Sequence, residues 1–106
     1  MTTRFAAIDV GTNATLLLVA ELDRDGGFRV VTDRAEIPRL GDGVDRAREL
    51  SAAGVERALK VLGEYVRVCE RLGVGEIAAV GTSALRDARN AKRFIARLKQ
   101  IGRAHV

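Results

Sequence analysis

Hydrophobic runs separated by short polar loops occupy the first forty positions of the chain. The runs over residues 4–10 and 15–21 each predict a buried strand. A third run, over residues 28–40, alternates in part and predicts another strand, in which Pro38 favours an edge position or a strand end. The turn residues at 23–27, Asp-Arg-Asp-Gly-Gly, separate the second and third runs. Together these segments predict a three-stranded antiparallel meander.

The middle of the chain has the spacing of an amphipathic helix. Ser51 is expected to cap this helix, and Gly73 is expected to end it. Leu50 is placed to pack against Val55 as a hydrophobic staple. The apolar positions with helical spacing are Val55, Ala58, Leu59, Leu62, Val66, Cys69 and Leu72.

A short apolar run over residues 76–81 predicts a further strand after this helix. The order strand, helix, strand favours a crossover connection and a parallel pairing. Asn90 can cap a second helix that runs through Gln100. The expected fold class is therefore α/β, with an antiparallel three-strand meander followed by a helix, a parallel strand and a helix.

Length and composition limit the possibilities. A chain of 106 residues with 47% hydrophobic and 30% charged residues is typical of one small folded domain. The longest apolar stretch, residues 14–20, is too short to cross a bilayer, and no signal-peptide pattern follows Arg4, so we expect a cytoplasmic protein without a membrane partner. Cys69 is the single cysteine, which excludes an internal disulfide and predicts a buried thiol.

The net charge of +4 has the sign that suits a polyanionic ligand. The basic residues of the helices alternate with acidic ones such as Glu56, Glu64 and Glu70, a pattern typical of a solvated helix face. Few aromatic residues are interleaved with them to stack on bases, so we expect no specific nucleic-acid partner. These basic residues are Arg57, Lys60, Arg67, Arg71, Arg86, Arg89, Lys92, Arg93, Arg97 and Lys99.

The first polar loop follows the first strand. Asp9 is expected to be a buried carboxylate at the end of this strand, where a charge is costly unless a cation, a donor or a reaction requires it. Gly11, Thr12 and Asn13 then form a tight turn whose backbone N–H groups can face a phosphate. The alternative is that Asp9 only hydrogen-bonds the turn. The spacing matches neither a Walker A loop nor a GxGxxG fingerprint.

A second polar loop follows the strand at 76–81. Thr82 and Ser83 are small hydroxylic residues that lead into a predicted helical turn containing Arg86, which indicates a phosphate site at a helix N-terminus. The alternative is that Ser83 caps a helix and Arg86 is a surface charge. Both loops follow the carboxyl ends of strands, so we expect them to meet at one edge of the sheet.

Three blocks carry a resemblance to a known family. Ala7-Ile8-Asp9-Val10-Gly11-Thr12-Asn13, Arg39-Leu40-Gly41-Asp42-Gly43, and Thr82-Ser83-Ala84-Leu85-Arg86-Asp87-Ala88 with Asn90 occur in this order. They resemble the N-terminal part of the exopolyphosphatase and guanosine pentaphosphate phosphohydrolase family, over a stretch from about Arg4 to Gln100. The resemblance implies a partial actin-like, ribonuclease H-like domain.

The resemblance also implies a function. Members hydrolyse terminal phosphates of inorganic polyphosphate or guanosine pentaphosphate with a divalent cation, magnesium being the expected ion, and the full-length parent is expected to be a homodimer. By this resemblance Asp9 is the metal residue. The residues expected to bind phosphate are Gly11, Thr12, Asn13, Thr82, Ser83 and Arg86.

Two parts of the family pattern are missing from the chain. The Ser-Gly-Glu-Glu-Ala-like segment with the catalytic glutamate and the second phosphate loop, similar to Asp-Ile-Gly-Gly-Gly-Ser, do not occur. We therefore expect an N-terminal fragment, residues 1–100 of the first domain, without catalytic residues and with negligible activity of its own. A truncated sheet should also expose apolar surface.

Residues 101–106, Ile-Gly-Arg-Ala-His-Val, leave the family pattern. They resemble the translation of a DNA sequencing adapter, which predicts a non-native tail and no role for His105; the alternative is an ordinary divergent tail. The encoding DNA distinguishes the two.

Two other functions remain open at this point. One is a fragment of a sugar kinase or actin-like ATPase, because an Asp-x-Gly-Thr loop also opens those proteins. The other is a small module that binds polyanions through Lys92, Arg93 and Arg97. The block at residues 82–88 favours the phosphatase.

Overall fold

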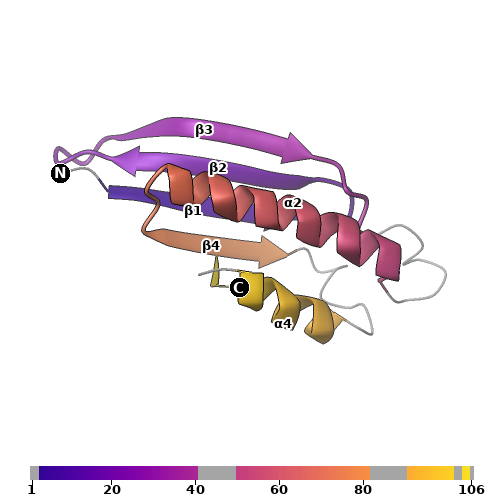
Figure 1. Cartoon of the computed structure of the whole chain (residues 1–106). Helices are drawn as coiled ribbons and strands as arrows, with labels where there is room; N and C mark the ends of the chain where they lie inside the picture. The colour runs from indigo at the N-terminus through magenta and orange to yellow at the C-terminus, as the bar shows by residue number, and fades with distance from the viewer. Residues whose placement is uncertain (1–2, 41–49, 82–90, 102–103, 106) are drawn as a thin grey trace.

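Among the residues that the structure describes, five strands form one mixed sheet, and three antiparallel strands at the start of the chain make up one side of it (Figure 1). They are β1 (Thr3–Val10), β2 (Thr15–Leu22) and β3 (Phe28–Glu36). The computed structural model describes residues 3–40, 50–81, 91–101 and 104–105. The predicted meander is confirmed, since β2 pairs antiparallel with both β1 and β3.

The third strand is shorter than predicted. β3 ends at Glu36, whereas the sequence pattern predicted a strand through Leu40. Pro38 cannot donate to a strand ladder, and Arg39 adopts a positive φ of 54°, so the chain leaves the sheet here. β3 lies at one edge of the sheet, as Pro38 indicated.

The second half of the sheet is parallel to β1. The helix α2 (Ala52–Arg71) connects β3 to β4 (Glu76–Gly81), and the pairing of β4 with β1 runs from Phe5 with Glu76 to Val10 with Gly81. The helix α4 (Ala91–Ile101) then leads to β5 (Ala104–His105), a two-residue strand parallel to β4 that the sequence did not predict. The order is β3-β2-β1-β4-β5, and the predicted crossover is confirmed.

The ends of α2 have the predicted caps. The Ser51 hydroxyl oxygen accepts a hydrogen bond from the Gly54 N–H at 3.0 Å. At the other end Gly73 has a φ of +69°, and its N–H donates to the Glu70 carbonyl at 3.2 Å. Leu50 is buried beside this helix start, as the staple requires.

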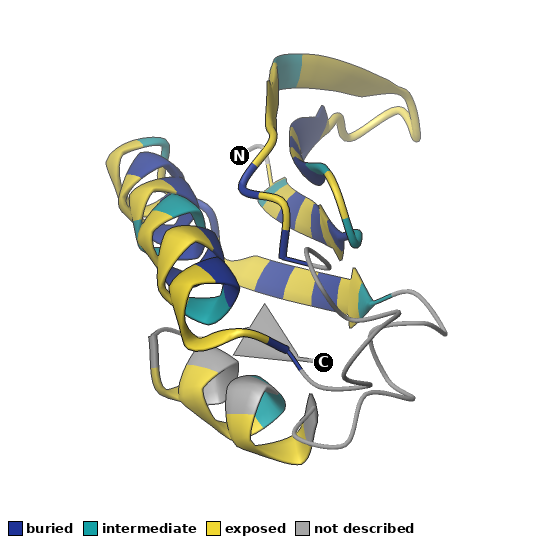
Figure 2. Cartoon of the chain, turned by 90° about the vertical axis from the view of Figure 1, so that its right-hand side faces the viewer, coloured by how far each residue is buried: buried dark blue, intermediate teal, exposed yellow. Residues whose placement is uncertain are grey.

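The core lies between α2 and one face of the sheet, where buried positions alternate along β1, β4 and the first part of β2 (Figure 2). The strand residues on this face include Ala6, Ile8, Val10, Leu17, Val19, Ile77 and Ala79. On α2, Cys69 is buried as predicted, and burial raises the pKa of its thiol. Tyr65 is also buried, although it was not among the apolar positions predicted for this helix. Its hydroxyl group donates a hydrogen bond to the Thr15 carbonyl at 2.8 Å, which satisfies the polar end of the ring.

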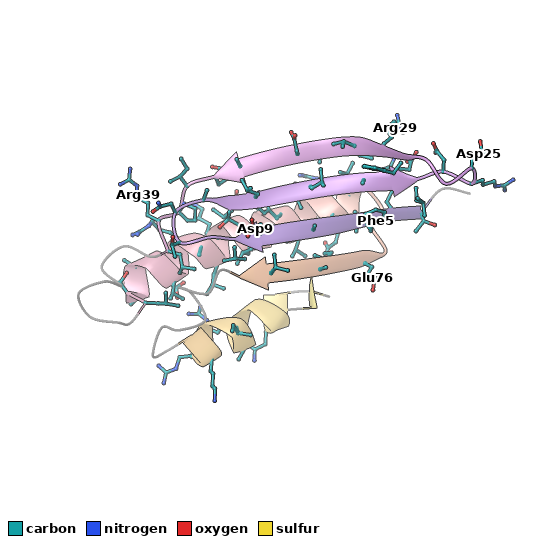
Figure 3. The ribbon with its side chains drawn as sticks, turned by 180° about the vertical axis from the view of Figure 1, so that it is seen from behind. Phe5, Asp9, Asp25, Arg29, Arg39 and Glu76 are labelled. Carbon is teal, nitrogen blue, oxygen red and sulfur yellow. The ribbon has the colours of Figure 1, made fainter. Side chains whose placement is uncertain are left out.

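The opposite face of the sheet, which we call the open face, carries large apolar side chains in contact with solvent. Figure 3 views the sheet from this side, and no helix among the described elements lies over it. The exposed apolar residues of this face are Phe5, Leu16, Leu18, Leu22, Phe28, Val30 and Val80. The expected exposure of apolar surface is therefore confirmed for the described part of the chain.

A charged cluster joins the amino-terminal end of β1 to its neighbours. Arg4 Nε donates to Glu21 Oε2 at 2.9 Å, and Arg29 Nη2 donates to Glu21 Oε1 at 3.0 Å. Arg4 Nη1 also donates to the Leu72 carbonyl at 2.8 Å, at the end of α2. The hydrogen bonds from Arg4 and then Arg29 hold the pKa of the Glu21 carboxyl below its usual range.

Neither described helix combines the length and the apolar character that a bilayer crossing demands.

Candidate functional site

Strands β1 and β4 end at neighbouring positions of the sheet. In the parallel pairing of β1 with β4, Val10 is the register partner of Gly81. The turn that begins at Gly11 and the segment that follows Gly81 therefore start side by side, at the carboxyl end of both strands. Thr82, Ser83 and Arg86 themselves lie outside the described residues, so their approach to Asp9 stays a prediction.

The turn between β1 and β2 needs a glycine at its first position. The Gly11 N–H donates to the Ala14 carbonyl at 2.9 Å. A Cβ atom on Gly11 would lie 2.7 Å from the same carbonyl oxygen, which is too close for any other residue in this conformation. Gly11 is therefore required for the shape of the turn, and its own N–H is already engaged.

The backbone N–H groups of the next two residues, Thr12 and Asn13, donate no such hydrogen bond in the described part of the chain. Within residues 3–40, 50–81 and 91–101, the N–H groups of Thr12 and Asn13 have no hydrogen-bond acceptor. Thr12 is partly exposed and Asn13 is exposed. Backbone donors without partners at a tight turn can bind an anion, as predicted for these residues.

The expectation that Asp9 is buried is wrong. Asp9 is exposed, because strand alternation places it with Phe5 and Ala7 on the open face while Ile8 and Val10 point to the core. Its register partners are Leu16 on β2 and Val80 on β4. Its carboxylate therefore pays no burial cost, and the argument that a buried charge needs a function does not apply. What remains is its position, two residues before Gly11 at the same end of the sheet (Figure 3).

A second carboxylate lies on the same face. Asp33 on β3 and Asp9 both line a shallow hollow of the open face, whose floor is largely apolar. The described residues contain no group of three or more His, Cys, Asp or Glu side chains that could hold a metal. Mg²⁺ usually takes only one or two protein carboxylates and completes its shell with water and phosphate oxygens, so Asp9 fits the implied cation.

A third segment, residues 38–40, makes a backbone contact with the β1–β2 turn. None of its residues was predicted to belong to the site. The Arg39 N–H donates to the Asn13 carbonyl at 3.1 Å. Arg57 on α2 donates from Nε to the Pro38 carbonyl at 2.6 Å and from Nη2 to the Arg39 carbonyl at 3.2 Å. One feature of the sequence could have pointed to Arg39 as a site residue: it is the first residue of the Arg39-Leu40-Gly41-Asp42-Gly43 block that resembles the family. Residues 41–43 of that block lie outside the described part.

Comparisons with known proteins point to one family. The sequence profile of the Ppx/GppA phosphatase family matches residues 18–104. The chain is similar to exopolyphosphatase 1 of Mycobacterium tuberculosis, with 27% identity over 92% of this chain and 28% of that protein. It is also similar to the guanosine-5'-triphosphate,3'-diphosphate pyrophosphatase of Vibrio cholerae, with 33% identity over 92% of this chain and 19% of that protein.

A solved structure gives the same result for the fold. The Ppx/GppA family member of Aquifex aeolicus superimposes with a TM-score of 0.90 at 32% sequence identity, over 94% of this chain and 32% of that one. This match confirms the predicted α/β, ribonuclease H-like fold class. The chain spans less than a third of the length of the two relatives just named.

The profile match extends over most of the chain, and the predicted fold and order of elements agree with it. The chain therefore belongs to the Ppx/GppA phosphatase family.

Proposed function

We propose that this chain is the phosphate-binding part of a phosphatase that removes terminal phosphates from inorganic polyphosphate or guanosine pentaphosphate, and that the 106 residues alone release negligible phosphate. One observation carries the proposal: the register of β1 and β4 sets Val10 beside Gly81, so both predicted phosphate loops start at one edge of the sheet. Family membership and the names of the relatives support it.

The residues of the site divide the work of holding an anion. The free amides of Thr12 and Asn13 donate to phosphate oxygens, Gly11 shapes their turn, and Thr82, Ser83 and Arg86 complete the site from the second loop. Asp9 holds a divalent cation, expected to be magnesium, together with phosphate oxygens and water. Such a cation, when bound, neutralises negative charge on the phosphates. Cytoplasmic location and a homodimeric parent belong to the same proposal.

Binding measurements test the proposal directly. Titration calorimetry of the 106-residue chain with polyphosphate should show saturable binding that is lost in Gly11→Ala, because the added Cβ opens the turn. The matched control is Gly26→Ala, which strains a glycine of φ +85° in the β2–β3 turn at the other end of the sheet. Equal polyphosphate affinity of the two variants would mean that the β1–β2 turn does not bind the ligand.

Activity is the second measurement. Phosphate release from polyphosphate by the purified chain should not exceed that of an Asp9→Ala, Arg86→Ala double variant. Release above this control would refute the expected lack of catalysis, while the binding result would stand.

The remaining hypothesis of a nonspecific polyanion-binding module makes a different prediction. It requires affinity for DNA and polyphosphate alike that falls in a Lys92, Arg93 and Arg97 variant and survives loss of Asp9, Thr12 and Arg86. The structure weighs against it at one position, because Arg97 Nη1 is 2.7 Å from Glu56 Oε1 and its charge is already paired.

A further inference from the structure

We propose that Arg39 is a second anion-binding arm of the candidate site and that Arg57 is the positioning residue that holds it there. The inference rests on the proposed function. It adds to that function a preference of the site for anions with several linked phosphates over a single phosphate. Its evidence comes from the segment 38–40, which carries none of the site residues predicted from the sequence.

The backbone of Arg39 is fixed on both sides. Its N–H donates to the Asn13 carbonyl at 3.1 Å, which ties it to the β1–β2 turn. Its carbonyl and that of Pro38 both accept from the Arg57 guanidinium, at 3.2 Å and 2.6 Å. Through these contacts, a movement of α2 against the sheet would displace Arg39 relative to the turn.

The first turn of α2 presses against the same segment. A Cβ atom on Gly54 would lie 3.0 Å from the Leu40 carbonyl oxygen and 3.5 Å from that of Arg39. The absence of a side chain at Gly54 therefore allows the close approach of α2 to this segment. Contacts from two elements distant in sequence, β1–β2 and α2, make the position of Arg39 well defined.

The conformation of Arg39 carries a cost. Among the described residues, Arg39 is the one non-glycine residue with a positive φ, at 54°. Glycine would adopt this conformation without a steric penalty. Strained backbone of this kind persists where the surroundings impose it, and it is found with particular frequency at ligand-binding sites.

The side chain of Arg39 is available for a ligand. Arg39 is exposed, and its guanidinium has neither an ion pair nor a hydrogen bond in the described part of the chain. Figure 3 shows it at the same end of the sheet as Asp9. A guanidinium presents parallel N–H donors that match two oxygens of a phosphate, so an unpaired arginine beside free turn amides favours an anion there.

The two arms define the class of anion. One phosphate can be held by the amides of Thr12 and Asn13, while a linked neighbour reaches the Arg39 guanidinium without a second loss of translational freedom. A single phosphate uses only one arm. Removal of Arg39 should therefore weaken binding of tripolyphosphate much more than binding of inorganic phosphate.

The first experiment measures both affinities on the 106-residue chain and its variants. Arg39→Gly should weaken tripolyphosphate binding about tenfold, the expected loss for one charge-assisted contact, and should change inorganic phosphate binding less than about twofold. It should also raise Tm, because glycine relieves the positive φ. The matched control is Arg24→Gly, which removes the same charge in the β2–β3 turn at the opposite end of the sheet.

The second experiment separates positioning from charge. Arg57→Gln should weaken tripolyphosphate binding in the parent chain and have no effect in the Arg39→Gly background, since Arg57 acts through Arg39. Equal losses in both backgrounds would mean that Arg57 acts by its charge, which overturns its positioning role.

The outcomes keep the two proposals apart. If the parent chain binds tripolyphosphate and Gly11→Ala abolishes this binding, but Arg39→Gly behaves like Arg24→Gly, the role of Arg39 is overturned and the proposed function stands. If the parent chain binds no tripolyphosphate, both are overturned.

Discussion

Thr15 is a residue that works against the stability of the fold. It begins β2 directly after the candidate anion-binding turn and is fully buried, with a relative exposure of 0%. Its hydroxyl oxygen has no hydrogen-bond partner in the described part of the molecule, although its carbonyl accepts from Tyr65 at 2.8 Å. An unsatisfied buried hydroxyl costs free energy that an apolar group of the same shape does not.

Thr15→Val should therefore raise the free energy of unfolding by about 1 kcal/mol. Thermal denaturation followed by circular dichroism measures this change, and Thr32→Val on the partly exposed edge strand is the control, with a smaller effect expected. A loss of stability in Thr15→Val would show that the hydroxyl has a partner after all.

At the scale of single elements, the two glycines within α2 have opposite environments. A Cβ atom on Gly54 would lie 2.9 Å from the Ser51 hydroxyl oxygen and 3.0 Å from the Leu40 carbonyl oxygen. In the described part of the chain, a Cβ atom on Gly63 would meet only Arg67 Nη1, at 3.8 Å. The same substitution therefore has different consequences at two positions of one helix.

Gly63→Ala should stabilise the protein by about 0.5–1 kcal/mol, the difference in helix propensity. Gly54→Ala should instead destabilise it by about 1–3 kcal/mol, because the added methyl group displaces the cap or the segment 38–40. Chemical denaturation of the two variants in parallel measures both signs. Equal stabilisation by both substitutions would contradict the close packing at Gly54.

The strands β1, β2 and β3 are joined by the Glu21 cluster, which gives a pH dependence. Glu21 has its pKa lowered by Arg4 and Arg29 in the folded state, so it binds a proton less readily folded than unfolded. Its contribution to stability is complete above the ordinary pKa of 4.5 for this carboxyl, and it is lost as the pH falls through the lowered folded value.

Glu21→Gln should accordingly lower the Tm at pH 7 and flatten the decline of Tm below pH 4.5, the ordinary value for this carboxyl. Glu76→Gln, at an exposed position of β4, serves as the control and should leave the acid limb unchanged. If the Tm of the parent chain and the Tm of Glu21→Gln fall equally at acid pH, the Glu21 cluster is not the cause of the pH dependence.

At the scale of the molecule, the sheet has one covered and one open face. Leu18 and Val80 are 39% and 61% exposed on the open face, whereas Ile8 and Leu17 are 1% exposed beneath α2. A continuous exposed apolar surface of this kind favours association in water. The asymmetry follows from strand alternation together with the position of α2.

We therefore expect the 106-residue chain to bind a hydrophobic dye and to sediment as a concentration-dependent mixture. Leu18→Lys should reduce both effects, while Ala96→Lys, which adds the same charge on the exposed side of α4, should not. Sharp, reversible unfolding of a monomer at high temperature would contradict this expectation.

The predictions from sequence succeeded where local patterns act alone. The meander, the caps at Ser51 and Gly73, and the parallel strand at 76–81 each follow from periodicity or from one residue's backbone preference, and each is confirmed. Asp9 was assigned to the wrong face because an apolar run such as 5–10 does not reveal which side a helix will cover. The hydrogen bonds of Arg57 to Pro38 and Arg39 could not be predicted from the sequence, because they join a side chain of α2 to backbone carbonyls 18 and 19 residues earlier in the chain.

The pairing of β1 with β4 has a consequence for how the molecule assembles. The turn at 11–14 is bounded by strands that are neighbours in the chain, so it can form early from local contacts. Its neighbour at Gly81 arrives only after the chain has passed through α2 and closed a long loop. We therefore expect a refolding chain to form its hairpins first and to complete the proposed phosphate site last, so that binding of a phosphate ligand would report the final step of folding.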